Sequence, residues 1–432
     1  MPRHLLGASA LLILTVLSAC SESSEPPPPP VPATYHKDVA PLVQEKCATC
    51  HVEGGIAPFT LNSYAEVFAM RTAVKASINQ RIMPPWLASQ DCTEYNHDLS
   101  LSDEQIALIS RWVDEGAVEG NPADAPALSG PAQGGLSRVD RELAMPVEYS
   151  PRQSPDDYRC FILDWPETAV RYVTGFRANP GRASIVHHVI AFVARPEEVA
   201  DYQALDEAEP GPGYTCFGGP GRGSGNVGWL GSWAPGSAGY DYPAGTGIRV
   251  EPGSKIILQV HYNLSSAVSV ADRTSVAVSL ESSVQKVAIM QPWADPAWLR
   301  AGGMHIPAGQ SDVRYRFGFD LSPVLSRVTN GVFRDNEPFT VHSAGLHMHT
   351  LGKWAKLEIE RKTGEMDCML RIPRWDFHWQ NGYELKQAKV VRPGDRITIE
   401  CHWDNSLPGA TDVSWGEGTG DEMCLGILYL TQ

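Results

Sequence analysis

The stretch from residue 138 to the C-terminus constrains the fold most, because helical periodicity nearly disappears there. Short runs of alternating apolar and polar residues replace it, separated by glycine, proline, asparagine or aspartate. The runs are Ala169–Phe176, Val186–Val193, Lys255–Tyr262, Val313–Phe319, Lys356–Arg361 and Arg396–Trp403. Their length and spacing predict antiparallel β-sandwiches, and about 300 residues favour two packed sandwiches over one.

The N-terminus has the pattern of an exported, lipid-anchored protein. The apolar run Leu5–Leu17 follows Arg3 and is too short to span a bilayer permanently, so residues 1–19 are expected to be a signal peptide. The next residues resemble a bacterial lipoprotein cleavage site, which implies lipidation of Cys20; a plain signal peptide with a chance cysteine is the alternative. A proline-rich stretch makes residues 20–33 a tether. We expect lipid anchoring to a membrane, on the periplasmic side of a bacterial membrane or at the cell surface.

Charge and cysteine content narrow the expected partners and covalent links. The formal net charge of -15 and the pI of about 5.3 provide no basic surface, so nucleic acid is not expected as a partner.

An exported protein can retain disulfides, and the chain has nine cysteines. Apart from Cys20 and a pair discussed next, an even number remains, which is compatible with complete pairing. These are Cys92, Cys160, Cys216, Cys368, Cys401 and Cys424.

A cysteine motif near the N-terminus predicts a covalently bound cofactor. The run Val39–Lys46 has helical periodicity and leads into Cys47-Ala-Thr-Cys50-His51. In Cys-x-x-Cys-His, two thiols form thioethers to haem c and the histidine supplies an axial imidazole. A redox dithiol does not need His51, and a zinc site needs a second Cys/His pair that is not found nearby. We therefore expect one haem c held by Cys47, Cys50 and His51.

The second axial ligand of the haem is expected downstream. Met83 lies in an Arg-Ile-Met-Pro-Pro-Trp stretch, where prolines favour an extended loop from which a thioether can reach the iron. Met70 lies in a helical pattern and is expected in the core, which leaves His97 as the reserve ligand. A closing helix is predicted at Asp103–Asp114, with Ser102 as its N-cap.

These features predict a multidomain chain. Residues 34–120 resemble a single-haem cytochrome c domain, which implies a small all-α fold. Residues 121–138 are rich in glycine, proline, alanine and serine and are expected to be a linker. Two antiparallel β-sandwich, jelly-roll-like domains are expected to follow, at residues 139–285 and 286–432.

The predicted strands carry histidines in an unusual arrangement. His187 and His188 are adjacent, and His261 lies in another predicted strand. His347 and His349 are separated by one residue, so they project from the same face of a strand and can share a metal ion. A single histidine in a sandwich is usually satisfied structurally, but this combination favours metal binding.

A methionine near the C-terminus favours copper as the metal. Met423 lies beside Cys424, which can fix the loop through a disulfide. Three imidazoles suit zinc or copper, whereas two imidazoles and a thioether select copper, which cycles through the soft cuprous state. The alternative is a methionine of the hydrophobic core. The His347, His349 and Met423 set therefore favours copper, whereas the three-imidazole set is compatible with zinc or copper.

Residues 140–432 resemble the ascorbate-dependent type II copper monooxygenases, the family of peptidylglycine alpha-hydroxylating monooxygenase and dopamine beta-monooxygenase. The matching stretches, in the family's order, are Asp157–Cys160, Val186–Val189, Leu258–Tyr262, His347–Lys353 and Asp421–Cys424. The resemblance implies an electron-storing copper on one ligand set and, on another, the copper that binds dioxygen and abstracts a substrate hydrogen. The first set is His187, His188 and His261; the second, with the candidate catalytic residues, is His347, His349 and Met423.

The resemblance also implies how these centres are arranged. They are expected on different sandwiches, across a solvent cleft, with Gln259 ordering the surroundings of His261. The implied disulfides are Cys160–Cys216 and Cys401–Cys424. Cys92 and Cys368 are left, and we hypothesise that they bridge the haem region and the C-terminal sandwich.

Departures from the family affect the expected substrate. Peptide-amidating members grip the peptide with an arginine before the His-x-His pair and with polar residues after the Met-Cys pair. Here the corresponding positions are Gly345, Leu425 and Ile427, with Tyr429 in place of a further apolar contact. Without that arginine, selection of a peptide carboxylate is not expected, and the substrate is expected to be a neutral or apolar small molecule.

The favoured function is hydroxylation of a C–H bond of a small organic substrate with dioxygen. Electrons are expected to pass through the fused haem, in place of or alongside an ascorbate-like reductant or a periplasmic redox protein. The main alternative is a periplasmic haem and copper protein that transfers electrons or binds copper without hydroxylating anything. A copper oxidase that makes peroxide is the third interpretation.

Overall fold

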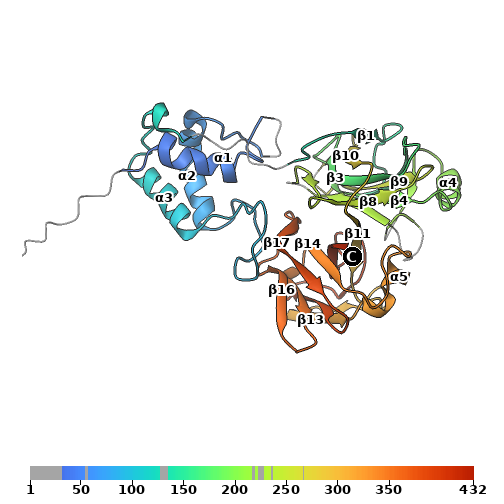
Figure 1. Cartoon of the computed structure of the whole chain (residues 1–432). Helices are drawn as coiled ribbons and strands as arrows, with labels where there is room; N and C mark the ends of the chain where they lie inside the picture. Colours follow the sequence, from blue (N-terminus) through green and yellow to red (C-terminus); the bar gives the residue numbers. More distant parts are fainter. Residues whose placement is uncertain are drawn as a thin grey trace, which may run out of the picture.

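The computed structural model describes residues 32–53, 57–126, 135–216, 219–221, 228–234, 237–265 and 267–432. The expected signal peptide and the lipidation of Cys20 lie outside these ranges. Among the residues described, no helix is both long enough and apolar enough to cross a membrane. A helical region precedes a much larger β region, and the two lie side by side (Figure 1).

The helical region consists of α1 (Ala40–Lys46), α2 (Tyr64–Asn79) and α3 (Asp103–Asp114), with short turns of helix at Tyr35–Val39 and Pro122–Asp124. Ser102 caps α3 by accepting a hydrogen bond from the backbone N–H of Gln105, so the predicted helix and its N-cap are confirmed. Trp112 and Ile109 lie in the hydrophobic core of this region, and Met70 packs against that core as expected.

The β region is built almost entirely of strands, as the alternating runs predict, and each predicted run overlaps one of them. The strands of its first half are β1 (Arg141–Ala144), β2 (Asp156–Asp164), β3 (Arg171–Asn179), β4 (Val186–Ala194), β5 (Tyr214–Thr215), β6 (Gly228–Trp233), β7 (Tyr240–Asp241), β8 (Thr246–Val250), β9 (Lys255–Asn263) and β10 (Ser275–Glu281). The strands of its second half are β11 (Lys286–Trp293), β12 (His305–Ile306), β13 (Gln310–Phe319), β14 (Phe339–His347), β15 (Gly352–Glu360), β16 (Met366–Ile372), β17 (Gly382–Val391), β18 (Arg396–Asn405), β19 (Val413–Ser414) and β20 (Leu425–Thr431). The short helices α4 (Val199–Ala208) and α5 (Leu325–Val328) and a 3-10 turn at Ser322–Val324 interrupt the strands.

The strands form two layered units that share one strand. In the first unit, β1-β10-β3-β8 packs over β6-β4-β9-β2-β5; in the second, β11-β20-β14-β17 packs over β13-β18-β15-β16. Strand β11 pairs with β8 and β6 of the first unit and with β20 of the second. The expected boundary at 285/286 falls at the start of this shared strand. Because β11 belongs to both sheets, the two halves are joined by backbone hydrogen bonds as well as by side chains.

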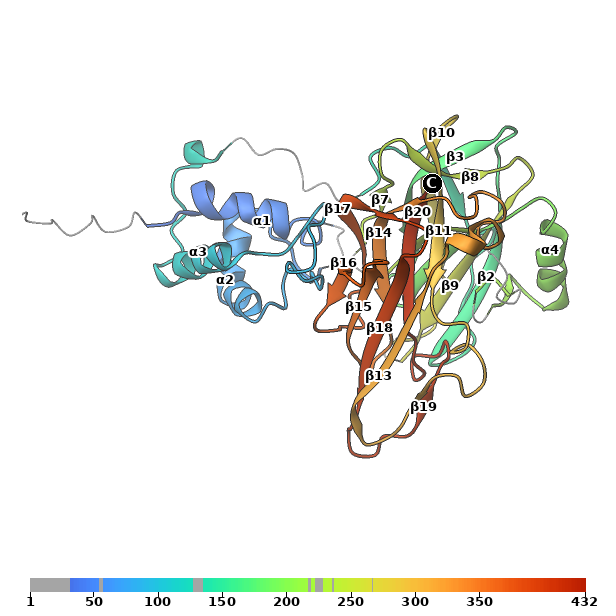
Figure 2. The ribbon, with the colours of Figure 1, turned by 60° about the horizontal axis from the view of Figure 1, so that its bottom comes forward.

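A disulfide between Cys92 and Cys368 joins the helical region to the second unit, as hypothesised. Cys92 lies between α2 and α3, and Cys368 lies on β16. The two views show the chain between α2 and α3 reaching the edge formed by β16 and β17 (Figures 1 and 2).

Candidate metal centre

Strand pairing brings the first three histidines together. His188 on β4 pairs with His261 on the neighbouring strand β9, and the register shifts between Val186 and His188. Such an irregularity re-aims side chains, and here it lets His187 point to the same place as His188. One ring nitrogen of each of the three histidines lies within 4.8 Å of those of the other two.

Hydrogen bonds identify which nitrogens of this cluster are available to a metal. His261 Nε2 donates to Asp156 Oδ1 over 2.9 Å, which leaves Nδ1 as the nitrogen with a lone pair. His261 Nδ1 faces His188 Nδ1 at 3.2 Å, and His187 Nδ1 is buried without a hydrogen-bond partner. Nitrogens that share one tetrahedral ion at about 2.0 Å lie about 3.3 Å apart. The spacing and the unpartnered His187 Nδ1 therefore fit a metal ion.

Burial keeps these three imidazoles neutral. It lowers the pKa of His187 to about 3 and that of His188 well below its ordinary value, and neighbouring His261 lowers both further. Burial also lowers the pKa of His261, although the hydrogen bond to Asp156 opposes it. Burial alone would raise the pKa of Asp156, but hydrogen bonds from His261 and Thr419 bring it below its ordinary value. At neutral pH the cluster therefore offers lone pairs rather than protons.

The second cluster lies at the end of β14. His347 Nε2 faces His349 Nε2 at 3.2 Å, the same spacing as in the first cluster. Each Nδ1 is fixed by an acceptor: Gln380 Oε1 at 2.5 Å from His347 and the carbonyl of Asp421 at 3.0 Å from His349. Burial lowers the pKa of both histidines, to about 3 for His347, so two lone pairs meet here as well.

Met423 belongs to a loop that is fixed beside this pair. The Cys401–Cys424 disulfide anchors the loop, and the Cys160–Cys216 disulfide stabilises the first unit; the resemblance implied both pairings. The buried Glu422 carboxylate accepts hydrogen bonds from the backbone N–H of His349 at 2.9 Å and from Trp403 Nε1 at 2.8 Å. Burial raises the pKa of Glu422 to about 7, and these hydrogen bonds oppose the rise. Met423 is 4% exposed and lines the same cavity as His347.

The two clusters lie close together. The ring centroids of His188 and His347 are 6.3 Å apart, and both residues line one cavity between the two units. Phe377 contacts both clusters, because its ring stacks on His187 at 4.7 Å and lies 5.9 Å from His349. The expectation that a solvent cleft separates the two centres stays a prediction.

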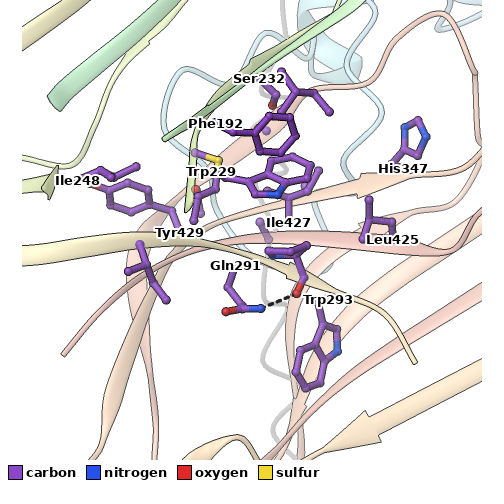
Figure 3. A pocket seen from close by; sticks show the side chains of 18 of the residues that line it. Phe192, Trp229, Ser232, Ile248, Gln291, Trp293, His347, Leu425, Ile427 and Tyr429 are labelled. Carbon is purple, nitrogen blue, oxygen red and sulfur yellow. Dashed lines mark hydrogen bonds between the residues drawn. The ribbon is translucent and has the colours of Figure 1, made fainter. Parts of the chain in front are cut away.

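A cavity of about 2240 Å³ lies between the two units, and His187 and His188 of the first cluster and His347 of the second line it. His347 pairs with Leu425 and Gly345 pairs with Ile427, so these residues share one face of the β14–β20 ladder. Figure 3 shows Leu425 and Ile427 on the side of His347, facing Trp229. The Tyr429 hydroxyl is already bonded to Thr246 Oγ1 at 2.9 Å. The wall next to the second cluster is therefore apolar.

Three residues of the expected haem site, Cys47, Cys50 and His51, directly follow α1. Cys47 is the C-cap of α1, and Cys47 and Cys50 are free thiols. His51 Nδ1 donates to the carbonyl of Phe59 over 3.0 Å, which leaves Nε2 for a metal. Met83 is half-buried, and His97, the reserve ligand, lines the large cavity. Free thiols and an oriented imidazole fit the chemistry of haem c attachment.

Sequence reasoning missed the side chains that hold the ligands. Gln259 was expected to order the surroundings of His261, but its amide donates to the carbonyls of Cys216 and Gly219, at 3.0 and 2.9 Å. Asp156 binds His261 instead, and Gln380 binds His347. No local pattern marks either residue, because each reaches its histidine only through strand pairing or loop folding.

Comparisons with known proteins identify similar copper-dependent enzymes. Residues 327–431 match the family model of the C-terminal domain of copper type II ascorbate-dependent monooxygenases. The chain is 25% identical over 206 residues to DBH-like monooxygenase protein 1 of Homo sapiens, which covers 46% of this chain and 32% of that protein. The Gallus gallus protein of the same name is 22% identical over 262 residues, covering 57% of this chain and 39% of that protein.

MOXD1 homolog 2 of Drosophila melanogaster is 25% identical over 186 residues, covering 40% of this chain and 23% of that protein. The matched part thus spans about a third of the length of these relatives. Among solved structures, VP2 of infectious bursal disease virus aligns over 69% of this chain and 75% of its own, with 11% identity and a TM-score of 0.17, which is too low to support an argument. The C-terminal part of the chain is therefore similar to copper monooxygenases at the level of the family.

Proposed function

We propose that this chain is a copper-dependent monooxygenase that hydroxylates a C–H bond of a small organic molecule with dioxygen. The observation that carries the proposal is the pair of neutral imidazole clusters on one cavity, one of them beside a buried methionine. The family match of residues 327–431 supports copper as the metal and oxygenation as the chemistry. Ascorbate or a similar reductant is the electron source that the family implies.

The two clusters are chemically different, which suits two roles. Nδ1 atoms of His187, His188 and His261 would hold one copper. Nε2 atoms of His347 and His349, with the Met423 thioether, would hold the other. Imidazole and thioether ligands stabilise copper(I), and each copper when bound supplies one of the two electrons that dioxygen reduction needs.

The surrounding residues position these ligands. Asp156 and Gln380 fix the ring orientations of His261 and His347, and Glu422 ties the Met423 loop to the backbone of His349. Phe377 packs against one histidine of each cluster. A site that holds its ligands in place before the metal binds loses little free energy to reorganisation.

The cavity supports a neutral, mainly apolar substrate. Leu425, Ile427 and Trp229 form its wall near His347, and Gly345 contributes no side chain. Gln291 and Trp293 also border the cavity, but the register pairs Gln291 with the core residue Leu428, which places both on the opposite face of the sheet. The polar atoms of these two residues therefore do not face the proposed copper site.

The haem is part of the same proposal. Cys47 and Cys50 would form the thioethers, and His51 Nε2 and the Met83 thioether would bind the iron. A donor fixed to the enzyme acts at a high effective concentration, alongside any diffusible reductant. Export and lipid anchoring at Cys20, on the periplasmic side of a membrane or at the cell surface, remain proposals that rest on the N-terminal sequence.

The test is transfer of an oxygen atom from dioxygen to a substrate. Copper-loaded protein would receive a reductant, isotopically heavy dioxygen and a metabolite extract, and mass spectrometry would search for products that gain one heavy oxygen. Met423→Ala should abolish such products. Met366→Ala is the matched control, because Met366 is 41% exposed on β16, and it should retain them.

The outcomes separate the alternatives. Oxygen consumption without a labelled product would favour a peroxide-forming oxidase. No oxygen consumption would favour a protein that only relays electrons or binds copper. A labelled product that persists in Met423→Ala would contradict the assignment of Met423.

A further inference from the structure

The segment from Trp86 to Asn96, here called the clasp, is fastened to the edge of the second β unit by several independent bonds. The Cys92–Cys368 disulfide is covalent. Tyr95 forms an isolated antiparallel bridge with Leu385 on β17, and its hydroxyl donates to the carbonyl of Met369 on β16 over 3.2 Å. The flanking backbone hydrogen bonds are Ser89 to Arg371 (2.8 Å), Asn96 to Glu384 (2.9 Å) and Lys386 to Glu94 (3.0 Å). The clasp is therefore a fixed junction rather than a loose tether.

Two aromatic rings of the clasp, Trp86 and Tyr95, pack together with Tyr383 of β17. The Trp86 ring meets Tyr383 edge-on, with centroids 4.9 Å apart, and Tyr95 lies 5.5 Å from Tyr383 and 6.2 Å from Trp86. Tyr383 is fully buried and Tyr95 is 6% exposed. The two sides thus meet in a packed aromatic contact, in which Tyr95 and Tyr383 are buried and Trp86 is half-buried. Packed atoms are a better medium for electron tunnelling than water-filled space.

Each end of this aromatic group leads to a proposed redox centre. Trp86 follows Met83, the proposed haem ligand, by three residues. Tyr383 follows Gln380 by three residues, and Gln380 Oε1 accepts the hydrogen bond of His347 Nδ1 at 2.5 Å. Tyr383 also pairs with Ala344 on β14, the strand that ends at His347. Bonded and packed atoms thus run from the Met83 loop to the His347–His349 pair.

We propose that electrons pass from the haem to the copper site through the clasp, a path here called the electron inlet. Trp86 and Tyr383 are positioning residues on this path, between the haem and His347. The inference rests on the proposed function. In each transfer, ferrous haem loses one electron and becomes ferric, and copper(II) at the His347–His349 cluster gains it and becomes copper(I); no bond or proton changes place. A periplasmic redox protein or an ascorbate-like reductant would then reduce the haem again.

The direct test is the rate of haem oxidation, which is read from its absorption bands and needs no substrate. Full-length protein with ferrous haem and copper(II) would be followed under anaerobic conditions by rapid mixing or flash reduction. Trp86→Leu removes the ring and should slow the transfer about tenfold or more, whereas Trp86→Phe keeps a ring and should recover most of the rate. Trp354→Leu is the matched control, since that indole stacks on His402, and it should leave the rate unchanged.

The possible outcomes test the electron inlet separately from the proposed function. Equal rates in wild type and Trp86→Leu, with the Cys92–Cys368 disulfide intact, would overturn the inlet. Oxidation of the haem at the same rate in copper-free protein would also overturn it, because copper would not be the acceptor. Absence of any labelled product from wild type with an external reductant would contradict the proposed function, yet the haem oxidation rates would still decide the inlet.

Discussion

Replacing Asp156 by alanine should weaken one copper site selectively. The Asp156 carboxylate accepts hydrogen bonds from His261 Nε2 (2.9 Å), Asn263 Nδ2 (2.9 Å), Thr419 Oγ1 (2.8 Å) and Thr419 N (3.1 Å). It therefore fixes both the tautomer and the orientation of His261. Loss of such a partner costs about 10- to 100-fold in metal affinity. That corresponds to about 1.4 to 2.8 kcal/mol of binding free energy.

Anaerobic competition against a chromophoric copper(I) chelator would measure this effect for both sites. Asp156→Ala should weaken one copper and leave the other unchanged, because the His347–His349 pair has its own partners. Asp164→Ala is the matched control, since Asp164 ends the same strand with its side chain 89% exposed. Unchanged affinity at both sites, or equal weakening of both, would refute the reasoning.

Three further predictions concern the substrate wall, the loop and the haem. Gly345→Arg should place a cation in the apolar wall, where an added Cβ meets nothing closer than 3.6 Å, and should suppress the labelled product while elemental analysis still finds two coppers per chain. Replacing Cys401 and Cys424 together by serine opens a link across 23 residues and should lower the free energy of unfolding by about 3 kcal/mol in chemical denaturation; an unchanged midpoint would contradict this. Replacing Cys47 and Cys50 by serine should remove haem that survives denaturing extraction, and covalent haem in that variant would exclude the proposed thioethers.

The strands and the histidine motifs could be predicted because their signals are local. Period-two alternation marks a strand wherever one face is buried. The expectation that His347 and His349 share one strand was wrong, because β14 ends at His347, yet the two rings still face each other just past the strand end. Ser102 was likewise identifiable as an N-cap from its own helix. The role of Met423 depended on the resemblance to a known family rather than on any pattern within the chain.

The parts that could not be predicted depend on pairing between distant residues. Asp156 lies 105 positions from His261, and only the register of β2 against β9 brings them together. Gln259 shares a face with His261 by alternation, but alternation does not reveal which partner lies opposite. Phe377 comes from a loop whose path no periodicity encodes, so its place between the two clusters was not foreseen.

The central claim is that the two histidine clusters bind two separate copper ions, although His188 and His347 lie only 6.3 Å apart. The most direct measurement is the copper content of the purified, reconstituted protein, with and without one histidine of each cluster. The account predicts two coppers per chain in wild type and one in each of His188→Ala and His347→Ala. A single copper in wild type that is lost completely in both variants would show one shared ion and would contradict the account.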